Sequence, residues 1–247
     1  MEFKSKYKCK VRYDGSMYYG FQRQSNLVSV QGEIERALSK VYNRKIEIIS
    51  ASRTDKGVHA LMQVFHYETE NNIPIEKLES IVNNVLNDDI YIYSFEIKDF
   101  DFHARYNVKF KTYRYNIDVS GKNDVFSSRY VLNYGSDLDI VRLNNIANNF
   151  IGKKDFKFVM ASGSYKENTV RTVSKAIFYK SGDIVSFEIT ADGFLYKMVR
   201  MIVGAILDVY ENKLTELELI NAIKNVDRKK FKRVVSSGGL YLVDIEY

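Results

Sequence analysis

Residues 51–60 read Ala51-Ser-Arg-Thr-Asp-Lys-Gly-Val-His-Ala60, and they place one carboxylate, Asp55, in a short polar stretch between cations. Apolar runs lie on both sides of it, at 46–50 and at 61–65. Because such short runs are typical of buried strands, the sequence predicts that Asp55 sits in a turn between two strands. Loops held by a rigid scaffold often carry binding and catalytic groups.

The cations next to Asp55 bear on its charge. A nearby Arg53 or Lys56 favours the ionised form of a carboxylate, so we expect Asp55 to be unprotonated at neutral pH and able to act as a nucleophile. The alternative is a structural turn in which Asp55 caps backbone amides and Gly57 supplies a positive φ. The turn alone is compatible with both interpretations.

Composition points to a globular protein with a polyanionic partner. Lysine and arginine total 37 against 31 acidic residues, which gives a net charge of +6, and 45% of the 247 residues are hydrophobic. The apolar stretches are strand-sized or interrupted by charge, unlike a membrane span. The single cysteine, Cys9, excludes an internal disulfide and a cysteine-based zinc cluster. We therefore expect a protein of a reducing cytoplasm, with no membrane association.

Hydrophobic periodicity predicts two α+β halves, residues 1–105 and 106–247. The first reads as β-α-β-β-α-β, with one helix capped by Ser29 and another entered at Pro74. The inward residues expected in the second of these helices are Leu78, Ile81, Val82, Val85 and Leu86. The second half has expected strands at 108–119, 170–179, 184–191 and 240–245 and expected helices at 138–150, 195–210 and 214–224. This order favours an α+β fold with mainly antiparallel sheets.

Three elements combine charge with apolar residues. The first strand alternates lysines with a set expected to be buried, namely Tyr7, Cys9, Val11 and Tyr13. The strand around Tyr113 carries lysines and tyrosines on one side. Arg200 lies at the flank of an apolar helix stripe, where an arginine either reaches water or pairs with a carboxylate beside the core.

Together these pieces resemble the TruA family of tRNA pseudouridine synthases over nearly the whole chain. The similar blocks follow the family's order: 13–15, 19–24, 29–31, 53–60, 102–105, 111–113, 169–172, 193–200 and 239–242. The chain departs from the family pattern at Ser52, where glycine is usual, at Lys56, where alanine is commoner, and at 234–238, which replaces an alanine- and proline-rich approach to the last strand.

The resemblance implies a fold, a reaction and partners. The fold is two pseudo-symmetric α/β halves with mainly antiparallel sheets that form one central sheet and a basic cleft. The first half carries the catalytic Asp turn, and the second carries the Tyr strand and the Arg helix. The implied reaction is isomerisation of uridine to pseudouridine at positions 38, 39 and 40 of the tRNA anticodon stem-loop. The resemblance implies a homodimer, and it implies neither a metal nor an organic cofactor.

It also implies roles for individual residues. Asp55 is the catalytic nucleophile. The substrate-binding residues are Tyr113, which stacks on the target uridine, Arg200, which pairs with Asp55, Leu240, which lines the pocket, and Arg53, which helps to extrude the base. A base must leave its stack to be reached, so an aromatic partner and cations suit such a pocket. An ionised carboxylate can attack C1′ or C6, or take a proton from the sugar, and the sequence leaves these routes open.

Other functions fit parts of the sequence. A metal-dependent hydrolase would use Asp55 with His59, His66 or His103, but these histidines lack the helical i, i+4 spacing of a zinc protease. A non-catalytic RNA-binding module would need only basic clusters such as 153–157 and 228–233. A paralogue with the same chemistry on a different RNA site would look much like this chain.

Overall fold

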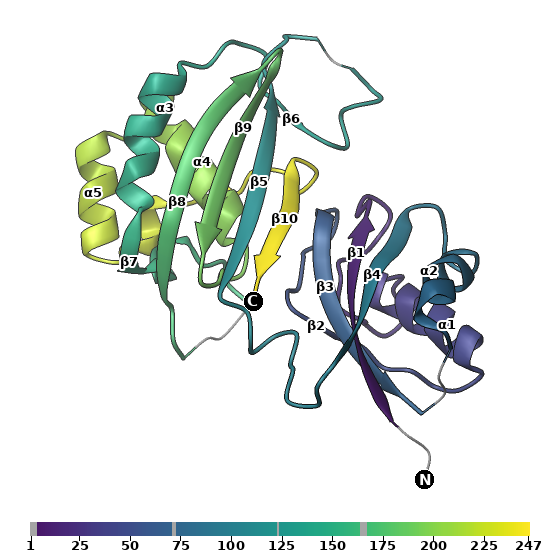
Figure 1. Ribbon diagram of the computed structural model, residues 1–247. Helices are drawn as coiled ribbons and strands as arrows, with labels where there is room; N and C mark the ends of the chain where they lie inside the picture. Colours follow the sequence, from purple (N-terminus) through teal and green to yellow (C-terminus); the bar gives the residue numbers. More distant parts are fainter. Residues whose placement is uncertain (1–3, 71–72, 123, 164–166) are drawn as a thin grey trace. The chain divides into compact units, whose positions relative to one another are not determined.

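The computed structural model describes residues 4–70, 73–122, 124–163 and 167–247. The chain divides into two units (Figure 1). Unit 1 contains the described residues up to Lys109 together with Tyr241–Tyr247, and unit 2 contains the described residues of Phe110–Leu240. Both units combine helices with mostly antiparallel strands, so the predicted α+β class is confirmed. No helix in these ranges is long and apolar enough to cross a membrane.

Unit 1 has the predicted β-α-β-β-α-β order. Its elements are β1 (Ser5–Tyr13), α1 (Val30–Tyr42), β2 (Ile49–Ser50), β3 (His59–Thr69), α2 (Ile75–Asn83), β4 (Ile90–Lys98) and, from Tyr241 onward, β10 (Leu240–Glu246). The strand order is β4-β1-β3-β10, with β2 paired to β3. Both β1 pairings are antiparallel, whereas β10 pairs with β3 in parallel. Helices α1 and α2 lie on the same side of this sheet (Figure 1).

The helices of unit 1 follow the sequence closely. Ser29 caps α1 and accepts a hydrogen bond from Gly32 N–H at 3.3 Å. In α2, Leu78 and Val82 are fully buried as predicted, but Ile81 is 37% exposed, so its predicted inward position is wrong. The helix has only nine residues, and one i, i+4 row is enough to cover the sheet at that length.

The buried face of β1 is also confirmed, since each of its four predicted residues is at most 5% exposed. Its basic face is less exposed than the alternation suggests. Lys6 is 5% exposed and donates to the carbonyls of Phe100 and Phe102 at 2.5 and 2.9 Å. The Lys8 Nζ lies 3.6 Å from a Glu96 carboxylate oxygen. Much of this positive charge is therefore used inside unit 1.

The strands of unit 2 pair mostly antiparallel, and its helices lie on one side of them (Figure 1). Its strands are β5 (Phe110–Asp118), β6 (Leu132–Asn133), β7 (Gly152–Asp155), β8 (Val170–Ser181) and β9 (Ile184–Ala191), and its helices are α3 (Ile140–Ala147), α4 (Met198–Tyr210) and α5 (Glu216–Lys224). The order β5-β9-β8-β7 is antiparallel throughout, and the short β6 pairs with β5 in parallel.

The described part of unit 2 also contains short 3₁₀ turns at Asn148–Phe150, Phe156–Val159 and Arg228–Lys230. The structure differs from the prediction at the start of α4, which begins at Met198 and not at 195. The residue before it, Lys197, has φ +57°, a left-handed conformation that cannot continue a helix. Residues 195–198 instead form a turn, in which Met198 N–H donates to the Leu195 carbonyl at 3.1 Å.

A buried carboxylate joins α1 to the segment that leads into the Asp55 turn. Glu35 is 5% exposed and accepts hydrogen bonds from Ile48 N–H at 3.1 Å, Gln31 Nε2 at 2.9 Å and Arg23 Nη1 at 2.8 Å. The buried Glu35 carboxylate and the buried Ile48 N–H have both lost water, so each depends on this cluster for its hydrogen bonds. The helix thereby positions the chain just before β2.

We expect Glu35→Ala to lower the free energy of unfolding by about 1–3 kcal/mol, because it leaves the buried Ile48 N–H without an acceptor. The matched control is Glu33→Ala on the same helix. Glu33 pairs with the exposed Arg36, and its removal should cost less than about 1 kcal/mol. Urea unfolding of both variants measures the difference, and equal losses would contradict this role of Glu35.

Candidate active site

Residues 55–58 form a tight turn between β2 and β3. Val58 N–H donates to the Asp55 carbonyl at 3.2 Å, and Gly57 has φ +75°, which glycine adopts without strain. The predicted turn between two strands is present, although the strand before it has only two residues. The side chain of Asp55 is half-buried.

The backbone of the loop before α1 lies directly against this turn. Phe21 N–H donates to the Thr54 carbonyl at 3.1 Å, and Gly57 N–H donates to the Tyr18 carbonyl at 3.3 Å. The bonded residues Thr54 and Gly57 lie on either side of Asp55 in the sequence. The turn is therefore held by main-chain contacts to a segment more than 30 residues away, and not by its own residues alone.

Two glycines make this close approach possible. Gly20 has φ +95°, and a Cβ built on it would lie 2.7 Å from the Thr54 carbonyl oxygen. A Cβ on Gly15 would lie 2.0 Å from the Val58 carbonyl oxygen. Any larger residue at either position would have to move the Asp55 turn, since both contacts are with backbone atoms.

A buried glutamine fixes the chain on the other side of the turn. Gln63 is fully buried in β3, where its Nε2 donates to the Ser52 carbonyl at 2.8 Å and its Oε1 accepts from Ser52 N–H at 3.2 Å. The same oxygen accepts from Val64 N–H at 3.1 Å. Sequence reasoning did not assign a role to Gln63, although a polar residue inside the apolar run 61–65 was a signal for one.

All three histidines of the chain use Nδ1 to accept backbone N–H groups. His59 accepts from Gly15 at 3.1 Å, and its Nδ1 lies 3.0 Å from an Asp14 carboxylate oxygen. His66 accepts from Ala104 at 3.1 Å. His103 accepts from the two residues that follow Ala104, at 3.2 and 3.3 Å. The histidines thus shape turns, and the described residues contain no group of three His, Cys, Asp or Glu placed to hold a metal ion.

The two cations next to Asp55 lie in different surroundings. The Lys56 Nζ is 4.0 Å from the centre of the Tyr19 ring, a cation–π contact. Arg53 lines a pocket of about 290 Å³ in unit 1. The lining also includes Gln22, Gln31, His103, Arg105 and Tyr106. Burial and the nearby Arg105 lower the pKa of Arg53 from its ordinary value, as expected where two arginines line the same pocket.

The other predicted site residues belong to unit 2. Tyr113 on β5 is 5% exposed, and its ring meets Phe194 edge-on at 4.9 Å between centres. The Arg200 Nε donates to the Val235 carbonyl at 2.8 Å, which ties α4 to the segment before β10. Leu240 is 6% exposed at the start of that strand. Asp55 and Arg53 are thus on unit 1, and the other three residues are on unit 2.

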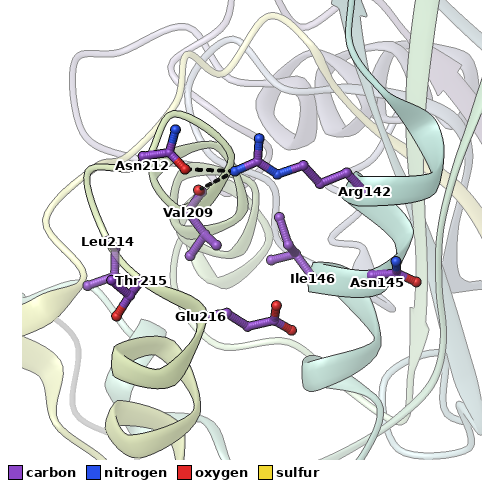
Figure 2. Close-up of a pocket in the computed structure, with 8 residues that line it drawn as sticks. All are labelled: Arg142, Asn145, Ile146, Val209, Asn212, Leu214, Thr215 and Glu216. Carbon is purple, nitrogen blue, oxygen red and sulfur yellow. Dashed lines mark hydrogen bonds between the residues drawn. The ribbon is translucent and has the colours of Figure 1, made fainter.

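A further pocket of unit 2, about 340 Å³ in volume, lies among α3, α4 and the start of α5 (Figure 2). Arg142 crosses it and donates to Asn212 Oδ1 at 2.8 Å and to the Val209 carbonyl at 3.5 Å (Figure 2). Glu216 accepts from Asn149 Nδ2 at 3.1 Å. Because these polar groups are engaged within the unit, the pocket is a structural gap between helices and no candidate site.

The amino-acid sequence matches the model of a known protein family. Residues 10–107 and 146–247 match a family model described as tRNA pseudouridine synthase. The chain belongs to the tRNA pseudouridine synthase family. It is therefore an enzyme of the pseudouridine synthase class, an isomerase, as the resemblance implied. The match covers Asp55, Arg200 and Leu240, whereas Tyr113 lies between the two matched stretches.

Individual members of the tRNA pseudouridine synthase family are similar over nearly their full length. Proteins named tRNA pseudouridine synthase A are 39% identical in Brevibacillus brevis, with 97% of this chain and 98% of that protein covered, and 41% identical in a Thermoanaerobacter species, with 96% and 97% covered. The corresponding protein of Clostridium acetobutylicum is 38% identical, with 97% and 98% covered.

We expect Gly20→Ala to lower the free energy of unfolding by about 2–4 kcal/mol, because it combines an unfavourable φ with overpacking against Thr54. Gly182→Ala is the matched control, since Gly182 also has a positive φ, +59°, but a Cβ added there would meet no atom within 4 Å. That variant should lose only about 1–2 kcal/mol. Chemical denaturation of both proteins tests this, and similar losses would show that the contact with Thr54 is unimportant.

Stability should also depend on the protonation of His66. Burial, then Lys6 and His103, lower its pKa from 6.5 to about 4, with Glu68 opposing. Between these pH values the unfolded chain binds a proton that the folded protein does not, so stability falls as the pH drops from about 6.5 towards 4. The loss is on the order of 2–3 kcal/mol.

Asparagine at this position retains an acceptor oxygen near the place of Nδ1 but does not titrate. Urea unfolding between pH 7 and pH 4.5 should therefore show a shallower pH dependence for His66→Asn than for the unchanged protein. The same slope in both proteins would assign the acid sensitivity to other groups.

Proposed function

We propose that the protein converts uridine to pseudouridine at positions 38, 39 and 40 of the tRNA anticodon stem-loop, with Asp55 as the catalytic nucleophile. The observation that carries this proposal is the Asp55 turn itself. Its carboxylate lies in a chain segment that the family model matches, and backbone bonds to residues 18–21 hold that segment in place. A fixed nucleophile loses little freedom on reaching the transition state.

The reaction needs a nucleophile and no redox step. The bond from C1′ to N1 breaks, the uracil turns, and C1′ bonds to C5; the proton lost from C5 is balanced by one gained at N1. Ionised Asp55 serves this sequence by attack on C1′, by attack on C6, or by removal of a sugar proton. Each route requires the carboxylate to be unprotonated, which the cations Arg53 and Lys56 favour.

Residues of unit 2 supply the proposed base pocket. Tyr113 stacks on the extruded uridine, and its edge-on contact with Phe194 fixes the plane of the ring. Arg200 pairs with Asp55, and its bond to the Val235 carbonyl limits the positions of the guanidinium. Leu240 lines the pocket.

The rest of the proposal concerns the RNA, the assembly and the compartment. Arg53 helps to extrude the base, and exposed cations near 228–232 contribute to the attraction of RNA. Within that cluster Lys230 is paired with Glu218, and the adjacent Arg233 is paired with Glu211. The effective positive charge of this region is therefore smaller than the sequence indicates. The protein acts as a cytoplasmic homodimer.

The test uses Asp55→Asn, which keeps the size of the side chain and removes its charge. We expect pseudouridine formation in an unmodified tRNA transcript to fall by more than about a thousandfold, while the affinity for that transcript changes less than about threefold. Asp88→Asn is the matched control, since Asp88 is an exposed aspartate of the same unit. Full activity of Asp55→Asn would overturn the nucleophile assignment.

The position of modification is measured on the same transcripts by carbodiimide mapping. Product at 38, 39 and 40 is the expected result. Product elsewhere would leave the chemistry intact and overturn the substrate assignment. Absence of product with the unchanged protein, despite tight binding, would favour a non-catalytic RNA-binding function.

A further inference from the structure

The pocket that Arg53 lines contains two arginines, Arg53 and Arg105. In the described part of the chain, no ion pair or side-chain hydrogen bond joins the guanidinium of Arg53 or of Arg105 to a partner. Other arginines of unit 1 do have such partners: Arg23 pairs with Glu35, Arg36 with Glu33 and Arg44 with Glu70. Two adjacent cations without a carboxylate favour an anionic ligand.

The turn that carries Arg105 is held by several hydrogen bonds. His103 Nδ1 accepts from the N–H groups of Arg105 and Tyr106 at 3.2 and 3.3 Å. Ala104 N–H donates to the buried His66, and the Ala104 carbonyl accepts from the terminal Tyr247 hydroxyl at 2.8 Å. The backbone is thus fixed on both sides before any ligand arrives, which reduces the ordering cost of binding.

An aromatic ring stands at the same pocket. Tyr106 is 76% exposed, and one face of its ring stacks on His103, with 4.1 Å between ring centres and an interplanar angle of 25°. A tyrosine this exposed has most of its ring in contact with water. It contributes little to the core, but it provides a flat surface on which a nucleobase can stack.

We propose that this pocket binds the RNA strand next to the target nucleotide, with one phosphodiester held between Arg53 and Arg105 and the neighbouring base stacked on Tyr106. A guanidinium matches the geometry of a phosphate through two parallel hydrogen bonds. Arg53 lies two residues before Asp55, so the bound phosphate positions the backbone close to the nucleophile. This inference rests on the proposed function in RNA modification.

The first test measures binding of an RNA hairpin with the sequence of the anticodon arm at several salt concentrations. Arg105→Gln should weaken binding about five- to tenfold and reduce the slope of log affinity against log salt by roughly one. Arg44→Gln, a surface arginine of the same unit, should change neither quantity by more than about twofold. Equal effects of the two variants would overturn the site.

The second test separates the ring from the charge. Tyr106→Ala should weaken binding at least about fivefold, and Tyr106→Phe should restore it, because stacking needs the ring and not the hydroxyl. A methylphosphonate, which is neutral, is then placed at each backbone position of the hairpin in turn. At one position the methylphosphonate should weaken binding by the unchanged protein. At that position it should cause no further loss of affinity for Arg105→Gln. If no position behaves in this way, the phosphate contact is refuted.

Kinetics distinguish this inference from the proposed function. With Arg105→Gln and Tyr106→Ala, KM for the hairpin should rise while kcat stays within about threefold, since both residues position RNA and neither reacts. Pseudouridine formation with an unchanged KM in both variants would overturn the inference alone. The predicted binding losses without any pseudouridine from the unchanged protein would overturn the proposed function and support the binding site.

Discussion

The backbone contact between residues 18–21 and the Asp55 turn is the constraint on which the rest of unit 1 depends. Glycine at position 20 permits the contact, since a Cβ there would lie 2.7 Å from a backbone oxygen. The contact places the loop before α1, the turn and β3 in one rigid arrangement. A carboxylate in a half-exposed turn would otherwise sample many positions, and its chemistry depends on a single one.

Buried polar side chains extend this arrangement into the surrounding strands. Glu35 holds the segment before β2, Gln63 holds Ser52, and His66 holds the turn at Ala104. Each forms hydrogen bonds to backbone groups that no strand partner satisfies, so each allows irregular chain to be buried at little cost. The three histidines act in the same way, because the Nδ1 of each accepts a backbone N–H group of a turn.

Local pattern predicted most elements correctly because helical and strand periods are local properties of the chain. The antiparallel strands at 170–179 and 184–191 and the cap at Ser29 are examples. The predictions that were wrong have separate physical reasons. Ile81 lies at the edge of a short helix, and residues 195–197 have an apolar helical pattern but form a turn that ends in a left-handed residue. Lys6 is buried because two carbonyls from the 100–102 segment accept from it.

The sequence by itself determined the reaction family, the α+β class and the turn that carries Asp55, because these follow from local motifs and their order. Tertiary structure alone decided that β10 returns to the sheet of unit 1 and that Gln63 supports the turn. It also decided that Arg53 and Arg105 share one pocket. Those features arise from contacts between residues that belong to different segments of the chain, and no periodicity within a single segment encodes such contacts.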